Sequence, residues 1–134
     1  MIIVYAYVCG DILHKGHIEA LKNARALGDK LVVGVLTDEA IMEKKPKPTM
    51  NFDERFDMIR ALGFVDCVVA QDSYNPIINL SKIRPDILAE SDSHAHTTDP
   101  HFIKALGSIR MIILPYYPAH SSSEIKRRIK KDEK

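Results

Sequence analysis

The sequence predicts an α/β fold of three layers, in which helices cover both faces of a five-stranded parallel sheet. The first observation is a set of apolar runs rich in Val and Ile that lack polar alternation, which is typical of strands buried on both faces. The second is that helix-period segments separate these runs, an order that makes the strands parallel. The predicted strands are Ile2–Val8, Leu31–Thr37, Asp66–Ala70, Asp86–Ala89 and Met111–Leu114.

Helix signals lie between the strands. From His17 to Leu27 apolar residues recur at helical spacing, and Gly28 is expected to cap the C-terminus of that helix. The other predicted helix starts share a capping residue followed by proline or, three positions on, by glutamate, and they lie at Asn51, Asn75, Asp99 and Ser121. These signals predict a single Rossmann-like α/β/α domain over residues 1–134, in which ligands bind beyond the carboxyl ends of the strands, where the strand order reverses.

Composition and charge narrow the class of protein. The 134 residues are 46% apolar and 28% charged, an ordinary composition for a soluble domain. The net charge of +1 offers no basic field for nucleic acid or an acidic membrane, so any anion needs a local site. The apolar start lacks a basic leader and soon reaches Asp11, so we expect neither a signal peptide nor a membrane span. Cys9 and Cys67 lie far apart without metal-ligand spacing, which favours a reducing, cytoplasmic location.

The loop between the first strand and the first helix is the main candidate site. Gly10 and Gly16 allow a ligand to approach the main chain closely, because neither has a Cβ. The free N–H groups and the dipole of the helix N-terminus favour a phosphate there. His14 and His17 are three positions apart across a turn, so both imidazoles can face the same anion. Nucleotidyl transfer needs such donors, because charge concentrates on the α-phosphate oxygens as the phosphorus becomes five-coordinate.

Two other interpretations of the histidine pair stay open at this point. The two imidazoles could be metal ligands, or they could be satisfied by backbone groups. Asp11 three residues ahead of His14, and the placement of both histidines at a strand-to-helix junction, favour a phosphate site.

The sequence Gly-Asp-Ile-Leu-His-Lys-Gly-His at 10–17 resembles the HxGH signature of the cytidylyltransferase-like superfamily. That superfamily includes glycerol-3-phosphate, phosphocholine and phosphoethanolamine cytidylyltransferases, phosphopantetheine adenylyltransferase and FAD synthetases. Residues 27–39, 44–48 and 51–55 are similar to the second strand, the lysine-bearing loop and the arginine helix of the small bacterial glycerol-3-phosphate enzymes. Residues 121–126 are similar to their Ser-rich phosphate-binding turn, and the resemblance extends over residues 2–129.

The resemblance implies transfer of CMP from CTP to a small phosphorylated alcohol such as glycerol 3-phosphate, or to a phosphonate, with release of pyrophosphate. It also implies Mg²⁺ on the triphosphate and a homodimer. Three side chains are expected to be catalytic, His14, His17 and Lys44, while Lys47 and Arg55 are expected to contact the acceptor or the phosphates. The implied nucleotide-binding residues are Cys9, Gly10, Asp11, Gly16, Asp92, Ser121, Ser122 and Ser123. Because in-line transfer forms no covalent enzyme intermediate, Cys9 is expected to offer backbone N–H groups rather than a nucleophile.

Several of these residues have plainer interpretations. The lysines at 44, 45 and 47 could be a solvated charge run, and the three serines could simply cap a helix. Arg55 could be a surface ion-pair partner of the acidic residues near it on its own helix, Asp53, Glu54 and Asp57.

The chain departs from the family pattern in places that bear on its substrates. Residues Val8–Asp11 look more like the corresponding segment of phosphonate-associated cytidylyltransferases. Of the family's Gly-Asp-Asp-Trp stretch after the fourth strand, only Asp92 is kept in register. An arginine expected before the Ser-rich turn is replaced around Tyr116–Pro118. The first alternative is therefore an adenylyltransferase that uses ATP with FMN, a sugar phosphate or phosphopantetheine, and the second is a non-catalytic nucleotide sensor. His94, His96 and His101 share a polar loop with Asp92 and Asp99 but lack structural-zinc spacing, so we predict no metal held by side chains.

Overall fold

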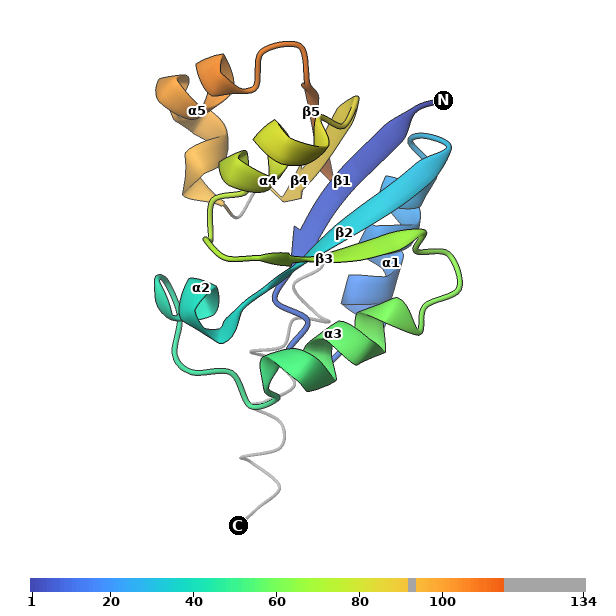
Figure 1. Cartoon of the computed structure of the whole chain (residues 1–134), viewed down its shortest axis with the longest axis vertical. Helices are drawn as coiled ribbons and strands as arrows, with labels where there is room; N and C mark the ends of the chain where they lie inside the picture. The colour runs from blue at the N-terminus through green and yellow to red at the C-terminus, as the bar shows by residue number, and fades with distance from the viewer. Residues whose placement is uncertain (92–93, 115–134) are drawn as a thin grey trace.

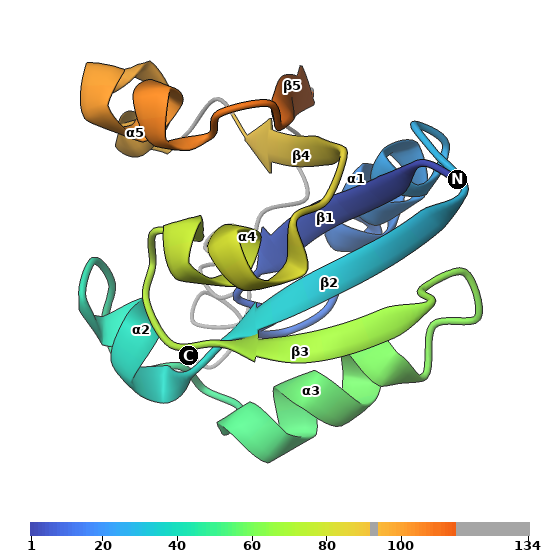
Figure 2. The same ribbon diagram turned by 45° about the horizontal axis from the view of Figure 1, so that its top comes forward.

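The structure is a computed structural model that describes residues 1–91 and 94–114. Five parallel strands form one sheet in the order β3-β2-β1-β4-β5, as Figures 1 and 2 show. The predicted parallel, Rossmann-like sheet is confirmed, and each strand lies within a residue or two of its predicted bounds. The strands are β1 (Ile3–Val8), β2 (Lys30–Leu36), β3 (Cys67–Gln71), β4 (Ile87–Ser91) and β5 (Arg110–Leu114).

Helices cover both faces of the sheet, which gives the predicted three layers (Figure 2). One face packs against α1 (Lys15–Arg25) and α3 (Phe52–Arg60) around Val33, Leu21 and Ile59. The other face packs against α2 (Asp38–Met42), α4 (Ile77–Ile83) and α5 (Pro100–Ala105), which is preceded by the 3-10 helix η1 (Ala95–Thr98). Apolar side chains thus pack against both faces of the sheet.

The strand order reverses at β1, because the chain builds outward to β3 and then crosses back to place β4 on the other side of β1. In open parallel sheets, this boundary at the carboxyl edge is where ligands bind. The loop from β1 to α1 leaves the sheet there, and so do the last residues of β4. The fold therefore places the β1–α1 loop and the carboxyl end of β4 at the same edge of the sheet, on neighbouring strands.

Some of the predicted helix ends are confirmed and others are wrong. The capping box of Asn51 with Glu54 and the Asp99–Pro100 start are confirmed. The Asn75–Pro76 start is wrong by one residue, because Pro76 is the N-cap of α4 and the Asn75 side chain accepts the Ile77 N–H at 3.0 Å from outside the helix. The prediction for Gly28 is wrong, since α1 ends at Arg25 with Ala26 as its C-cap. Gly28 instead lets β1 approach, because a Cβ there would lie 2.7 Å from the Ile2 side chain. The helix predicted from Ser121 lies outside the described residues.

In the part of the chain that the structure describes, every helix is too short or too polar to cross a lipid bilayer.

Candidate functional site

The N-terminus of α1 is capped by two histidines that bind the backbone of their own turn. His14 is the N-cap residue, and its Nδ1 accepts a hydrogen bond from the Gly16 N–H at 3.0 Å. Nδ1 of His17 accepts from the His14 N–H at 3.2 Å, which closes a reciprocal capping box. The two rings lie with their centroids 4.0 Å apart. This cap is the histidine pair of the predicted site, brought together as expected.

These two hydrogen bonds fix the chemical form of the rings. An Nδ1 that accepts a backbone N–H carries no proton, so the proton of the neutral ring is on Nε2. Burial above all, with smaller effects of the neighbouring His14 and Lys45, lowers the pKa of His17 from 6.5 to about 4, against the opposing charge of Asp11. His17 is therefore neutral near pH 7, with Nε2–H as a donor for a ligand oxygen. The same bonding pattern assigns the Nε2–H form to neutral His14.

The backbone of the loop takes the left-handed conformation at two positions. Gly10 has φ +76°, a left-handed conformation that L side chains rarely adopt. Ile12 has φ +53°, which is unusual for a β-branched residue and strains the backbone on the order of 1–3 kcal/mol. Strain of this kind persists only where the surrounding structure holds it in place.

Asp11 is one of the groups that hold this loop. Its side chain is buried and accepts hydrogen bonds from the N–H groups of Thr49 at 3.0 Å and Met50 at 2.9 Å. Asp11 thus ties the end of the lysine-bearing loop to the β1–α1 loop. A role for Asp11 in nucleotide binding stays a prediction, and the contacts described here are with the protein backbone.

Arg55 is the second group that joins the loops. Its guanidinium is fully buried and donates to the carbonyl oxygens of Cys9 at 2.5 Å and Leu36 at 2.6 Å. It also donates to the Met50 carbonyl at 3.1 Å and pairs with Asp38 at 2.6 Å. The alternative of a surface pair on its own helix is wrong, because the ion-pair partner is Asp38 and the guanidinium is buried. Arg55 fastens the carboxyl ends of β1 and β2 together, and a phosphate contact by its remaining N–H stays a prediction.

In the lysine-bearing loop, Lys45 makes contacts that the sequence did not predict. Lys44, Lys45 and Lys47 are all exposed. The charge of Lys45 lowers the pKa of His17, and its ammonium hydrogen-bonds the hydroxyl of Tyr74. The charge of Lys45 therefore acts at the position of the His17 ring. The sequence alone could not select Lys45 among three neighbouring lysines, because the direction of each side chain depends on the turn after α2.

The segment after β4 brings some of the predicted residues together and leaves others out. His94 and His96 both contact the carboxylate of Glu90, a residue that the sequence did not single out. His101 instead lies exposed in α5, and Asp99 caps that helix. Asp92 and the three serines at 121–123 lie outside the described residues.

In Rossmann-like sheets, a first loop that ends at a helix N-terminus is a common place for phosphate groups to bind, so the class of protein this fold and loop indicate is one that handles phosphorylated ligands. The sequence profile of the family described as cytidylyltransferase-like matches residues 9–128. The chain belongs to this family of nucleotidyltransferases.

Several proteins of known name are similar to this chain. It is 41% identical over 90 residues to bifunctional protein HldE of Campylobacter concisus, a match covering 66% of this chain and 19% of that protein. It is 46% identical over 71 residues to ethanolamine-phosphate cytidylyltransferase of Arabidopsis thaliana, covering 53% of this chain and 17% of that protein. The chain thus matches less than a fifth of the length of either relative.

Among solved structures, the lipopolysaccharide core biosynthesis protein from Thermoplasma volcanium GSS1 is similar with a TM-score of 0.78 and 27% identity. That match covers 87% of this chain and 98% of the other.

Proposed function

We propose that this protein transfers CMP from CTP to a small phosphorylated alcohol or a phosphonate and releases pyrophosphate. The observation that carries the proposal is the double-histidine cap, in which Nδ1 of both His14 and His17 accepts a backbone N–H and the ring proton is therefore on Nε2. Two neutral donors at a helix N-terminus suit the α-phosphate of a nucleoside triphosphate. Membership of the cytidylyltransferase-like family supports the same reaction.

The reaction is an in-line substitution. An oxygen of the acceptor phosphate or phosphonate attacks the α-phosphorus, the new P–O bond forms, and the bond to the bridging oxygen of pyrophosphate breaks. The acceptor oxygen is already anionic, so the site needs no general base. The Nε2–H groups of His14 and His17 stabilise the charge that concentrates on the α-phosphate oxygens. An ammonium from the loop after α2 neutralises the phosphates, and Lys45 is better placed for this than Lys44 because it already acts on His17.

Mg²⁺ is the cofactor that the family implies, and the residues present fit an ion held mainly by the nucleotide. The acidic residue of the loop, Asp11, already accepts two backbone N–H groups, whereas His14, His17 and Lys45 supply donors for phosphate oxygens. Mg²⁺ commonly binds substrate phosphates and water with few protein ligands. When bound, it offsets the negative charge of the triphosphate.

The experiment is a pyrophosphate-release assay with Mg²⁺ and each of CTP, ATP, GTP and UTP. The acceptors are glycerol 3-phosphate, ethanolamine phosphate, which the name of the Arabidopsis relative suggests, and a phosphonate. Release with CTP alone supports the proposal, whereas release with ATP alone and with FMN, a sugar phosphate or phosphopantetheine indicates the adenylyl alternative. Thermal stabilisation by a nucleotide without pyrophosphate release from any acceptor indicates a sensor.

The histidine pair is tested by variants in the same assay. His14→Ala and His17→Ala are each expected to lower turnover by about 10²–10³, the effect of losing one oxyanion-type donor. His101→Ala is the matched control, because His101 is exposed in α5 and takes no part in the cap. Thermal unfolding of each variant separates lost turnover from lost folding. A homodimer stays a prediction, which sedimentation velocity of the full chain tests.

A further inference from the structure

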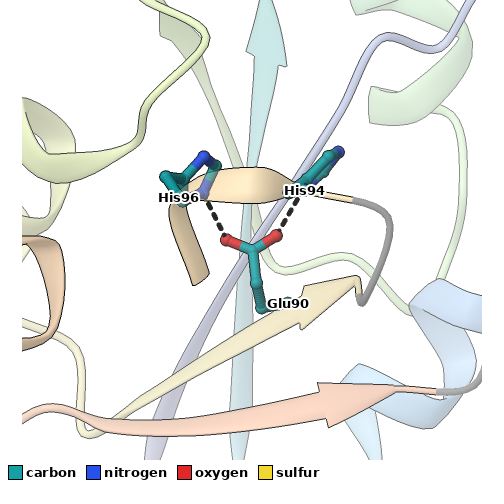
Figure 3. Close-up of side chains that lie close together, drawn as sticks. All are labelled: Glu90, His94 and His96. Carbon is teal, nitrogen blue, oxygen red and sulfur yellow. Dashed lines mark hydrogen bonds and ion pairs between the residues drawn. The ribbon is translucent and has the colours of Figure 1, made fainter. Parts of the chain in front are cut away.

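At the end of β4, three side chains that bind metals in other proteins converge on one another. His94 Nδ1 lies 2.6 Å from one carboxylate oxygen of Glu90, and His96 Nε2 lies 3.0 Å from the other. Figure 3 shows the carboxylate between the two rings, with one oxygen directed to each. Their potential ligand atoms all lie within 4.8 Å of one another. This Glu90–His94–His96 set shares no residue with the His14–His17 cap.

The carboxylate at the centre of the set is buried and directs one oxygen to each ring. Glu90 is 2% exposed, and its oxygens lie 2.6 Å from His94 Nδ1 and 3.0 Å from His96 Nε2. A carboxylate removed from water in this way needs polar partners, and a bound cation is one of the groups that can supply them. The two imidazoles are 17% and 14% exposed, so an ion from solvent can reach the set past their rings.

Tyr7 supplies a hydrogen bond that orients the carboxylate. Its hydroxyl lies 2.8 and 2.7 Å from the two oxygens of Glu90, and 2.9 and 2.8 Å from His94 Nδ1 and His96 Nε2. To hold an ion, the two ring nitrogens exchange their contacts with Tyr7 and Glu90 for the ion, while the Tyr7 hydroxyl donates to the carboxylate. Metal-binding carboxylates commonly accept such a bond on the oxygen that does not bind the ion.

We propose that Glu90, His94 and His96 bind one zinc-type divalent cation, distinct from the Mg²⁺ carried by the nucleotide. One carboxylate and two imidazoles form a ligand set typical of zinc, and imidazole favours zinc, cobalt or nickel over magnesium. Around tetrahedral zinc, ligand atoms lie about 3.3 Å apart, so the 2.6 Å pair of His94 with Glu90 needs to open by about 0.7 Å and the 3.0 Å pair of His96 with Glu90 by about 0.3 Å. Three protein ligands leave a fourth position for water or a substrate oxygen.

The position of the set connects it to the transfer site. Tyr7 and Glu90 each precede the last residue of neighbouring strands, at the boundary where the strand order reverses. The His94 ring packs edge-on against Tyr74 with centroids 5.5 Å apart, and Tyr74 hydrogen-bonds Lys45. The ion would thus lie at the ligand-binding edge of the sheet, on the side of α4 and α5.

The test is a calorimetric titration of chelator-stripped full-length protein with Zn²⁺ and with Mg²⁺, without nucleotide. We expect one Zn²⁺ per chain at this set and no comparable Mg²⁺ binding. Tyr7→Phe should weaken Zn²⁺ binding about 10- to 100-fold, and Glu90→Gln or His96→Gln should weaken it more. His101→Gln is the matched control, a histidine on the same segment whose removal should leave affinity unchanged. The visible spectrum of Co²⁺-loaded protein should change in His96→Gln and not in His101→Gln.

Two results would overturn the proposal. One is wild-type protein that binds neither Zn²⁺ nor Co²⁺, which leaves the set a hydrogen-bonded network of Tyr7, Glu90 and two histidines. The other is binding that survives in Glu90→Gln and His96→Gln but disappears in His17→Gln, which places the ion at the His14–His17 cap. If Glu90→Gln fails to fold, His96→Gln decides, because the His96 side chain is partly exposed. Neither result bears on pyrophosphate release with Mg²⁺, so the two proposals fail independently.

Discussion

Replacing His17 by glutamine should make the protein less sensitive to mild acid. In the folded chain burial lowers the pKa of His17 to about 4, whereas an unfolded imidazole titrates near 6.5. Between these values the unfolded state binds more protons than the folded state, so the free energy of unfolding falls as pH falls. The glutamine side chain is also polar, but it cannot take up the proton.

The size of the effect follows from the two pKa values. At about pH 5 an unfolded imidazole is almost fully protonated, whereas the folded His17 carries about a tenth of a proton. Integrated from about pH 7.5 to 5, this difference destabilises the wild type by about 2 kcal/mol. The substitution also removes the hydrogen bond of His17 to the His14 N–H, which changes the free energy of unfolding by the same amount at both pH values. That contribution cancels when the difference between variant and wild type is compared at the two pH values.

The assay is urea unfolding of wild type and His17→Gln at both pH values. The stability gap between the two proteins should shift by about 2 kcal/mol in favour of the variant at the lower pH. Glu90 and the other titrating groups are common to both proteins and cancel. His101→Gln, which removes an exposed histidine, should follow the wild type. If wild type and His17→Gln lose stability in parallel, His17 is not held neutral and the donor assignment is wrong.

Three further predictions concern the supports of the site. Arg55→Met should destabilise the fold by about 3–5 kcal/mol in urea unfolding, because it leaves Asp38 and three carbonyl oxygens without their donor. The control Arg60→Met breaks an exposed pair with Asp57 and should change stability by less than about 1 kcal/mol. Gly34→Ala should lower the melting temperature, because the new Cβ would overlap the Tyr5 hydroxyl, whereas Gly63→Ala meets nothing within 4 Å and should be neutral. Lys45→Ala should lower kcat/KM about 10-fold or more and Lys44→Ala should lower it less, and equal effects would contradict the placement of Lys45 beside His17.

Much of the fold could be predicted from local sequence patterns. The strands were recognisable because residues buried on both faces of a sheet are almost all apolar, as in Leu31–Leu36. The Asn51 and Asp99 helix starts depend on side chains that bind the backbone within three positions, so sequence spacing determines them. Gly28 could not be interpreted from local sequence, because a Cβ at this position would clash with Ile2, a residue 26 positions away, and the glycine does not mark a helix end.

The candidate site divides in the same way. The His14–His17 pair was predictable because both residues belong to one turn. The role of Arg55 was not, because its partners Cys9, Leu36 and Asp38 come from other elements that meet only in the folded chain. The contact of Glu90 with Tyr7 could not be predicted for a related reason. Glu90 lies in a buried strand, and it comes close to Tyr7 only because β1 pairs with β4.

The most direct test of the central claim is long-range ¹H–¹⁵N NMR of the histidine side chains near pH 7, with and without Mg²⁺ and CTP. We predict that His14 and His17 each show a bare Nδ1 and a protonated Nε2, and that their Nε2 signals shift when the nucleotide binds while those of His101 do not. Imidazolium or Nδ1–H forms at positions 14 and 17, or Nε2 signals that a bound nucleotide leaves unchanged, would contradict the assignment of these two rings as the phosphate donors.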